Sequence, residues 1–580
     1  MDTKLSSRER AAYLKDMSEV KLDLLIIGGG ITGAGIAWDA SSRGMVTGLV
    51  EMNDFASGTS SRSTKLIHGG LRYLKQGEIK LVREVGSERA LLHKSAPHLV
   101  DPIPMLLPIY KNGTYGYWTS SIGLLIYDWL AGVKGSERRK MYGRDDAVIL
   151  EPLFKQDGLK GAGYYYEYRT DDARLTIEVL KSARASGAMM TNYTKATAFI
   201  YRGGRVVGVK AEDLLSGDIY SIYAKKIVNA AGPWVDEIRT QDNSLKGKRL
   251  LLTKGVHLVV DYNKVPVKQA AYFDVPGGRM IFVIPRGKKT YIGTTDTVYE
   301  GDIQNPGITE ADRKYLLDAV NHAFPDVQLC LTDIETAWSG LRPLVREEGK
   351  GPSEISRKDE LFVSHSGLIT IAGGKLTGFR KMGEKVVNLV SKQLQDEEGT
   401  IFPPCTTDRK PISGGLMNGG TYHDLKKAMV KQGRSFGINI DETFDLMSRY
   451  GANTLEIFRY IDESKRDEMM EDGLLYAEIK YSIDHEMTLN AVDFLLRRTG
   501  WLLFDRQRAE RIVGEVVSIM TELLEWDGHE LDRQWLMLQE QVKIAWNTNE
   551  DIRVDLNVAG KSVKDNQTEL RSPGFLHNFL

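Results

Sequence analysis

A glycine-rich turn near the N-terminus constrains this chain more than any other feature of its sequence. Residues 28–33 read Gly-Gly-Gly-Ile-Thr-Gly and fit the pattern G-x-G-x-x-G. An almost continuous apolar run at residues 22–27 precedes them and predicts a central parallel strand that is buried on both faces. Helical spacing at residues 31–43 and a second strand-like run at residues 45–50 follow. The segment is therefore predicted to fold as a βαβ unit that binds a dinucleotide.

Each glycine of this turn has a separate physical task. Gly28 permits the tight turn, Gly30 lets a pyrophosphate approach the backbone, and Gly33 lets the helix pack closely on the strand. The phosphates are then held by N–H groups at the helix N-terminus. Glu51 ends the second strand 18 residues after Gly33, where a ribose hydroxyl needs an acceptor.

The residues after Glu51 bear on the choice between NAD and FAD, which both use such a turn. Residues 53–65 (Asn-Asp-Phe-Ala-Ser-Gly-Thr-Ser-Ser-Arg-Ser-Thr-Lys) are rich in glycine and hydroxyl side chains. A segment of this kind beside the second strand can run along a pyrophosphate and a flavin ring. A flexible surface loop is the alternative, but the compact sequence that follows it at residues 66–73 favours the flavin.

Bulk properties limit the remaining classes of function. A chain of 580 residues is too long for one ordinary core, so two or three domains are expected. The 77 Lys and Arg residues nearly balance the 78 Asp and Glu residues, which argues against a general nucleic-acid binder. The two cysteines, Cys330 and Cys405, form no CxxC pair, so a disulfide framework or a zinc site is not expected and a reducing cytoplasm fits. We expect Cys330 to be a small core residue.

Membrane contact, where it occurs, is expected to be peripheral. The chain offers no run of about 18 uncharged apolar residues that could span a bilayer. Residues 120–140 combine an apolar run with a cluster of four basic residues, a pattern that suits a contact on one membrane face. The same pattern suits a core helix followed by a solvated loop, and we prefer that interpretation.

The order of predicted elements indicates a nucleotide domain assembled from separated pieces. Strand-like segments at residues 225–231 and 367–371 each precede further glycines, and residues 279–295 alternate like a hairpin that turns near residues 286–287. A mostly antiparallel domain is therefore expected between the pieces. Residues from about 420 to 545 show helical spacing and predict a separate all-helical domain. The polar stretch at residues 547–580 is expected to be poorly ordered.

At this point the sequence resembles the FAD-dependent glycerol-3-phosphate dehydrogenases. The resemblance is carried by IIGGGITGAGIAWDASSRG, GTSSRSTKLIHGGLRYL, RTDDARL, VNAAGPW, SGLRPL and IAGGKLTGFRKM, in the family's order between about residues 20 and 385. It implies an α/β (α+β) fold, in which a Rossmann-like FAD-binding domain carries an inserted antiparallel-sheet substrate domain and an all-helical C-terminal domain follows. The expected limits are 20–400 for the oxidoreductase region (FAD domain about 20–75, 170–250 and 360–400; substrate domain about 76–169 and 251–359), 405–545 for the helical domain and 546–580 for a tail.

The resemblance also implies where non-covalent FAD binds. The strand near Val209 is expected beside the adenine, with Ala231 and Gly232 closing that end. Residues 374–377 are expected at a helix N-terminus facing the flavin pyrimidine, where the helix dipole and Lys375 stabilise the reduced flavin. The full expected set is Gly28, Gly30, Ile31, Thr32, Gly33, Glu51, Ser60, Ser61, Thr64, Lys65, Leu66, Val209, Ala231, Gly232, Gly374, Lys375, Leu376 and Thr377.

Oxidation of sn-glycerol 3-phosphate requires cations for a dianionic phosphate, for which arginine is well suited. The resemblance implies that Arg72, Arg342, Arg357 and Lys375 bind the phosphate. Arg357 has the least motif support, because its surroundings differ from the usual form of the family. A lone arginine is more often a surface ion-pair partner, but Arg72 and Arg342 lie in apolar or glycine-rich sequence, where an unpaired guanidinium is costly.

The base that removes the hydroxyl proton is left open between two histidines, His68 and His257. Histidine titrates near neutral pH and suits this task, although a lone histidine is more often structural. We choose His68, or a water activated by an arginine, while hydride passes from C2 to N5 of FAD and Arg342 stabilises the developing alkoxide. The expected catalytic set is His68, Arg72, Arg342, Lys375 and His257. Residues 171–172, two aspartates, predict a helix start rather than a metal site, and no metal is expected.

The resemblance implies that a membrane quinone receives the electrons and that dihydroxyacetone phosphate is released, in glycerol catabolism. A glycerol-3-phosphate oxidase that uses oxygen, or an amine or amino-acid oxidase on the same scaffold, is the alternative. A flavin-binding or structural protein is the non-enzymatic reading, and near-zero net charge argues against an RNA partner. The protein is expected in the cytoplasm or on the inner face of the cytoplasmic membrane, and the sequence leaves open a homodimer.

Overall fold

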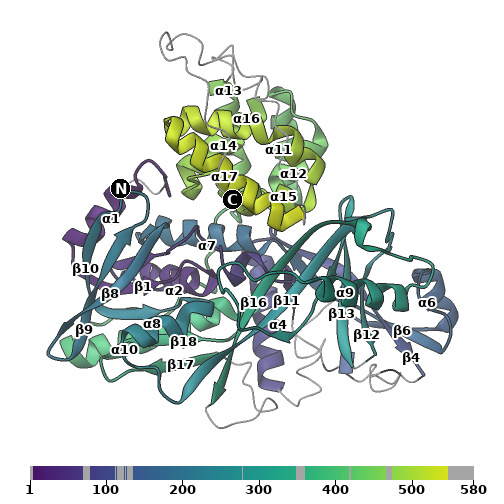
Figure 1. Ribbon diagram of the computed structural model, residues 1–580, viewed down its shortest axis with the longest axis horizontal. Helices are drawn as coiled ribbons and strands as arrows, with labels where there is room; N and C mark the ends of the chain where they lie inside the picture. Colours follow the sequence, from purple (N-terminus) through teal and green to yellow (C-terminus); the bar gives the residue numbers. More distant parts are fainter. Residues whose placement is uncertain are drawn as a thin grey trace, which may run out of the picture.

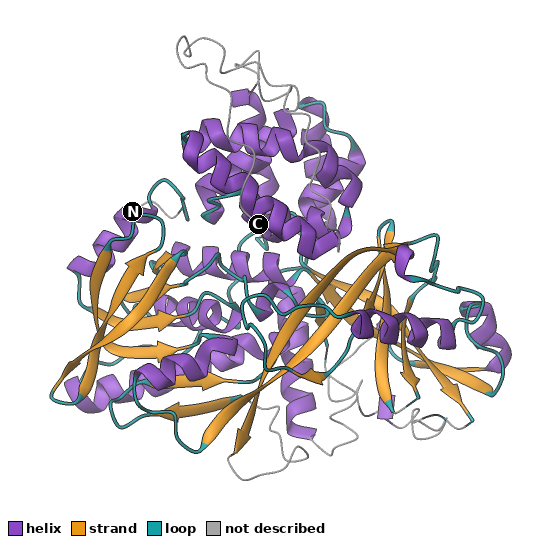
Figure 2. Ribbon diagram, viewed as in Figure 1, coloured by secondary structure: helices purple, strands orange, loops and turns teal. Residues whose placement is uncertain are grey.

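The computed structural model describes residues 4–68, 79–111, 113, 123–124, 126, 135–276, 278–347, 359–416, 420–464 and 473–546. Two β-sheets lie side by side, and a group of helices covers one side of the junction between them (Figures 1 and 2). The predicted fold class is confirmed: a Rossmann-like region and a mostly antiparallel region together form the body, and an all-helical region follows.

The βαβ unit forms where the sequence predicts it. β1 (Leu22–Ile27) is buried along its whole length, and α2 (Ile31–Ser42) and β2 (Thr47–Val50) follow. β1 pairs in parallel with β2 on one side and with β10 (Ile219–Asn229) on the other. Its two faces and both edges are therefore covered, which explains the continuous apolar run.

The sheet built around this unit contains eight strands in the described residues. Its main path runs β17-β18-β10-β1-β2-β7, and a further pair, β8 and β9, extends from β10. β1, β2, β7, β10 and β18 are parallel, whereas β17 and the β8–β9 extension pair antiparallel. The strands not yet given are β7 (Met189–Thr191), β8 (Thr194–Arg202), β9 (Arg205–Asp213), β17 (Glu360–Val363) and β18 (Ile369–Ala372).

The second sheet contains ten strands in the described residues, and nearly all of its pairs are antiparallel. Its path runs β15-β11-β14-β13-β12-β4-β6-β3, with β16 on β11 and β5 on β6, and only β12 and β4 are parallel. The predicted hairpin is confirmed as β13–β14. The strands are β3 (Leu66–Ile67), β4 (Val100–Tyr110), β5 (Lys140–Gly143), β6 (Leu159–Thr170), β11 (Lys248–Asp261), β12 (Ala270–Val275), β13 (Arg279–Arg286), β14 (Lys289–Gly293), β15 (Thr297–Val298) and β16 (Ile334–Glu347).

Helices cover the sheets and complete their cores. In the first sheet α2 packs between α7 and α10, so that ten of its twelve residues are buried. In the second sheet α9 packs against β11 to β14. These regions contain α1 (Arg10–Glu19), α2, α4 (Ile79–Ser95), α6 (Arg144–Leu150), α7 (Asp172–Ala185), α8 (Val235–Gln241), α9 (Glu310–Ala323) and α10 (Phe379–Glu398).

The helical C-terminal region, here residues 420–546, is confirmed as all-helical over its described residues. It packs on both sheets: one core cluster contains Leu495 and Leu502 of this region with Trp338 of the second sheet. Another contains Met487 of this region with Leu24 and Leu49 of the first sheet. The helices are α11 (Tyr422–Ser435), α12 (Ile440–Tyr450), α13 (Thr454–Ser464), α14 (Gly473–Glu486), a π-helix (Asp493–Arg498), α15 (Trp501–Phe504), α16 (Arg506–Leu524) and α17 (Gly528–Trp546).

Two smaller predictions have opposite outcomes. Asp171 is the N-cap of α7 and accepts a hydrogen bond from the Arg174 N–H, so the aspartate pair begins a helix as predicted. Cys330 is exposed and its thiol contacts Asp333, so the prediction of a core residue was wrong. The apolar alternation around it ends at a 3₁₀ turn, which places the cysteine outside the core.

No helix among the described residues is both long and apolar enough to cross a bilayer. Most of the segment 120–140, predicted to be either a core helix or a membrane contact, lies outside the described residues, as does the expected tail at 547–580.

Candidate active site

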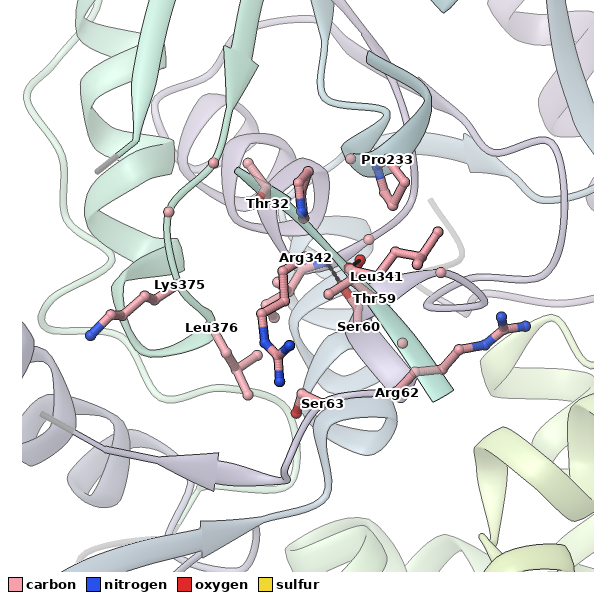
Figure 3. Close-up of a pocket in the computed structure, with 18 of the residues that line it drawn as sticks. Thr32, Thr59, Ser60, Arg62, Ser63, Pro233, Leu341, Arg342, Lys375 and Leu376 are labelled. Carbon is pink, nitrogen blue, oxygen red and sulfur yellow. Dashed lines mark hydrogen bonds between the residues drawn. The ribbon is translucent and has the colours of Figure 1, made fainter. Parts of the chain in front are cut away.

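A large cavity of about 990 Å³ lies where the two sheets meet. The glycine turn, the segment after β2 and residues 371–377 ahead of α10 form one wall, and β11, β13 and β16 form the other. Such a volume at a junction between domains is typical of a cofactor and substrate site. Figure 3 shows the hydroxyl side chains of Thr59, Ser60 and Ser63 beside Arg342 in this cavity.

Close packing around the glycine turn leaves no room for side chains. Gly28 has a φ of +118°, and a Cβ atom there would lie 2.5 Å from the carbonyl oxygen of Ala230. A Cβ at Gly33 would overlap the carbonyl oxygen of Gly28, so the absence of a side chain lets α2 pack against β1. At Gly30 a Cβ would stand 3.0 Å from the Ser60 hydroxyl oxygen, inside the cavity wall.

The N-terminus of α2 opens into the cavity. Its N-cap is Gly30, which has no side chain to satisfy the first N–H groups, and the Ile31 N–H donates to the Ser60 hydroxyl at 2.9 Å. Gly30, Ile31 and Thr32 line the cavity, so the positive end of the helix dipole faces it. Backbone donors, a glycine cradle and a ring of hydroxyl side chains are the groups that hold a pyrophosphate, and they fit FAD.

Glu51 ties the end of β2 to the glycine turn. Its carboxylate accepts hydrogen bonds from the N–H groups of Gly29, at 2.7 Å, and Asn53, at 2.9 Å. Burial raises the pKa of Glu51 to about 7, against the opposing effect of these two bonds. Glu51 lines the cavity, and each carboxylate oxygen can accept a further hydrogen bond of the kind that a ribose hydroxyl donates.

Arg342 reaches the cavity from β16 in the second sheet. Its guanidinium donates to the Thr294 hydroxyl at 2.9 Å and lies 3.4 Å from the Asp296 carboxylate. One third of the side chain is exposed, and the residue lines the cavity. In Figure 3 it runs toward Leu376, whereas the other labelled arginine, Arg62, points away from it.

His68 lies on the cavity wall at the end of β3, with its ring edge-on to Phe282 at a centroid distance of 6.0 Å. Burial, with the cations Lys375 and Arg89, lowers the pKa of His68 to about 3. The imidazole is therefore neutral near pH 7 and can accept a proton or a hydrogen bond.

His257 also lines the cavity but is held more firmly. Its ring is stacked on Trp338 at 4.7 Å and its Nε2 atom lies 2.9 Å from the Thr64 hydroxyl. Burial, followed by the charges of Arg342 and Lys65, moves the pKa of His257 well below its ordinary value. The residue is 1% exposed, and its contact with the Thr64 hydroxyl holds the ring in place.

The structure brings most of the expected site residues together. Those on the cavity wall are Gly28, Gly30, Ile31, Thr32, Glu51, Ser60, Thr64, Leu66, His68, Ala231, Gly232, His257, Arg342, Gly374, Lys375, Leu376 and Thr377. Gly33 lies behind the wall, where it packs α2 on β1. Arg72 and Arg357, expected at the phosphate, lie outside the described residues.

Besides Gly33, three expected cofactor residues do not line the cavity: Ser61, Lys65 and Val209. Val209 is buried in the core that packs on α1, and Thr194–Ala196 of the neighbouring strand β8 lines the cavity instead. The Lys65 ammonium pairs with the Asp172 carboxylate at 2.5 Å and with the Ser61 carbonyl oxygen at 3.0 Å. Because a buried ammonium requires such partners, Lys65 fixes the loop to α7, and it is not among the residues that line the cavity.

Sequence reasoning missed much of the wall that the second sheet supplies. Gly255, Thr294 and Arg342 meet because β11 pairs with both β14 and β16. The aromatic residues of this wall lie on strands whose alternating pattern predicted only burial in a core. The missed lining residues include Tyr165, Tyr272, Gly278, Arg279, Met280, Phe282 and Leu341. Among the described residues there is no group of three His, Cys, Asp or Glu side chains that could hold a metal ion.

Two family models match the chain. Residues 23–380 match the model of the FAD dependent oxidoreductases, and residues 405–531 match the C-terminal domain of alpha-glycerophosphate oxidase. The first covers the two sheets and the cavity, and the second covers most of the helical C-terminal region.

Similar proteins span almost the whole chain. The aerobic glycerol-3-phosphate dehydrogenase of Bacillus subtilis is 52% identical over 91% of this chain and 96% of its own length. That of Staphylococcus haemolyticus is 48% identical over 95% of this chain and 99% of its own. The crystal structure of the glycerol-3-phosphate dehydrogenase from Bacillus halodurans, complexed with FAD, superposes with a TM-score of 0.81 at 44% identity, covering 93% of this chain and 98% of that one.

Proposed function

The chain belongs to the family of FAD-dependent glycerol-3-phosphate dehydrogenases, and we propose on that premise that it passes the electrons of its substrate to a membrane quinone. The reaction oxidises sn-glycerol 3-phosphate to dihydroxyacetone phosphate, with FAD as the cofactor. The observation that carries the site assignment is the convergence of the glycine turn, His68, Arg342 and Lys375 on one cavity.

The phosphate of the substrate binds to Arg342 and Lys375, with Arg72 and Arg357 as further proposed partners. Arg342 supports this role, since Thr294 and Asp296 fix its guanidinium in place and the residue lines the cavity. A held guanidinium loses less side-chain freedom on binding than a loose one. Arg342 also stabilises negative charge on the C2 oxygen as the hydroxyl loses its proton.

His68 accepts the proton of the C2 hydroxyl. In the free protein the pKa of this imidazole is about 3, for which burial and the cations Lys375 and Arg89 are responsible. A dianionic phosphate beside Lys375 offsets the effect of that cation and raises the pKa of His68 toward the range of a useful base. The base is therefore strengthened when the substrate is bound, and it does not become protonated in the free enzyme near pH 7.

Bound FAD supplies a two-electron acceptor for the hydrogen on C2. The chain contributes the groups around it: the N-terminus of α2 and Ser60 hold the pyrophosphate, and Glu51 accepts from the ribose. Residues 374–377 lie ahead of α10, so the positive end of that helix and Lys375 favour negative charge on the reduced flavin.

The test is to mix the purified protein with sn-glycerol 3-phosphate without oxygen and to follow the flavin absorbance near roughly 450 nm. Rapid bleaching is expected, with none for glycerol or for the opposite enantiomer. Bleached enzyme is then mixed with a quinone analogue or with oxygen. Fast reoxidation by quinone and slow reoxidation by oxygen supports the proposal, the reverse identifies an oxidase, and a flavin that never bleaches points to an amino-acid substrate.

A quinone lies within the bilayer, so we also propose a peripheral contact with the inner face of the cytoplasmic membrane. Sedimentation with vesicles that contain anionic lipid tests this contact, and protein that stays in the supernatant at low salt contradicts it. A homodimer is the assembly that we propose for the free protein. Light scattering on the purified protein distinguishes it from a monomer.

A further inference from the structure

A buried ionic cluster joins the helical C-terminal region to the segment that follows β2. On the helical side it contains Arg497 and Arg498, which lie in the π-helix that precedes α15. On the other side it contains Asp54, three residues after Glu51. All three side chains are at least nine-tenths buried, so the charges are held by one another and not by water.

Asp54 is fully engaged by these partners. Two nitrogens of Arg498 donate hydrogen bonds to the carboxylate, at 2.7 Å to Oδ2 and 2.9 Å to Oδ1. The Nε atom of Arg497 donates to Oδ2, and the amide of Asn192 donates to Oδ1 at 3.1 Å. Although burial alone would raise the pKa of Asp54, Arg498 and Arg497 hold it at about 2. The carboxylate is therefore ionised and paired near pH 7.

The two arginines are themselves fixed within the helical C-terminal region. Arg498 donates to the carbonyl oxygen of Glu486 at 2.8 Å, and Arg497 donates to the Asp493 carboxylate at 2.5 Å. Asp493 also accepts from the Tyr193 hydroxyl at 2.7 Å. The position of Asp54 is thus set by the π-helix and not by its own loop alone.

Two hydrogen bonds from backbone N–H groups link the segment around Asp54 to the cofactor site. The Asn53 N–H donates to the Glu51 carboxylate at 2.9 Å, and the Ala56 N–H donates to the Gly29 carbonyl oxygen at 3.1 Å. Asp54 lies between these two bonds in the chain. A shift of Asp54 consequently moves both Glu51, the proposed ribose acceptor, and the glycine turn beside the pyrophosphate.

We propose that the helical C-terminal region positions the FAD site: Arg497 and Arg498 hold Asp54 and thereby fix residues 51–60 against the glycine turn. The arginines act through Asp54 and are positioning residues, because they are absent from the cavity wall. The inference rests on FAD binding and not on the identity of the substrate, so it can fail while the proposed reaction holds, and the reverse.

A general stabilising contact between the two regions is the competing explanation. Such a contact exists in the ion pair of Arg174 on α7 with Glu486, 2.6 Å apart and equally buried. Stability alone cannot separate the two roles, since either pair stabilises the fold. The two roles are separated by comparing the affinities for FAD and for FMN. Residues 51–60 face the adenosine and pyrophosphate part of FAD, and FMN lacks the adenosine and one phosphate of that part.

The experiment compares Arg498→Lys with Arg449→Lys in the full-length protein. Arg449 is a matched control: it is buried and paired with Asp445 at 2.5 Å and Glu478 at 2.6 Å, both in the helical C-terminal region. Each protein is stripped of flavin and titrated with FAD and then with FMN, and its thermal unfolding is recorded.

For Arg498→Lys we expect the Kd for FAD to rise at least about tenfold while that for FMN changes less than about twofold. Arg449→Lys is expected to lower Tm and leave both Kd values within about twofold. An unchanged Kd for FAD in folded Arg498→Lys, or an equal loss of FMN, overturns the proposal. If Arg498→Lys does not fold, Arg497→Lys removes the hydrogen bond from the Arg497 Nε atom to Asp54 and is expected to weaken FAD binding about threefold. An unchanged Kd for FAD in that variant also overturns the proposal.

Discussion

Replacing Gly28 by alanine tests the close packing on which the cofactor site depends. At a φ of +118°, an alanine is strained by about 1–3 kcal/mol. Its Cβ would also lie 2.5 Å from the Ala230 carbonyl oxygen, which forces the turn away from β10 at a further cost of about 1–3 kcal/mol. The second cost falls on the geometry that FAD needs, so the Kd for FAD is expected to rise by a factor of about 5 to 150.

Gly44 provides the matched control for this prediction. It has a φ of +84°, but a Cβ there would meet nothing within 4 Å. Gly44→Ala therefore carries the backbone strain without the clash, and it should lower Tm while leaving FAD bound. The assays are titration of the flavin-free proteins with FAD and thermal unfolding. FAD affinity within about twofold of the parent in Gly28→Ala, at a normal Tm, would refute the reasoning.

Four further predictions concern the chemistry of the cavity. The pKa of Glu51 is about 7 in the free protein, and ribose hydroxyls favour its ionised form. The affinity for FAD should therefore rise with pH up to about 7 and then stay constant. An identical pH dependence of the affinity in Glu51→Gln contradicts this prediction. Arg342→Lys should lower kcat/KM for glycerol 3-phosphate by about 10- to 100-fold with unchanged FAD affinity, and a normal KM and kcat would exclude the phosphate role. His68→Gln should lower kcat by about 100-fold or more while KM changes little, and full activity would move the base elsewhere. Lys375→Met should lower the flavin reduction potential by about 30 mV, equivalent to about 1.4 kcal/mol. The potential is measured against reference dyes, and an unchanged value would show that this cation lies too far from the flavin to stabilise its reduced form.

The parts of the site that are local in sequence could be predicted. The strand at 22–27, the glycine turn and Glu51 lie within one βαβ unit, whose pattern depends on hydrophobic periodicity and on the spacing of a few glycines. The aspartates at the start of α7 were also predictable, since N-capping is decided by neighbouring residues. These features need no knowledge of the rest of the chain.

Contacts across long sequence separations could not be predicted in the same way. Val209 was placed at the adenine, but the cavity is lined by the neighbouring strand β8, because alternation does not tell which strand of an antiparallel extension faces a ligand. Lys65 was placed at the cofactor, but its charge is satisfied by Asp172, 107 residues later. Exposure of Cys330 was likewise set by the turn that precedes β16.

The sequence by itself determined the dinucleotide-binding unit, the class of cofactor and the helical character of residues 420–546, since each follows from local period and composition. Only the tertiary structure decided which strands form the second wall of the cavity and which side chains fix its loops in place. The pairing of β11 with β16 brings Arg342 to the cavity that the glycine turn also lines, and the π-helix brings Arg498 to Asp54 across 444 residues. These contacts depend on which strands and helices pack against one another, and that packing is determined by the whole chain.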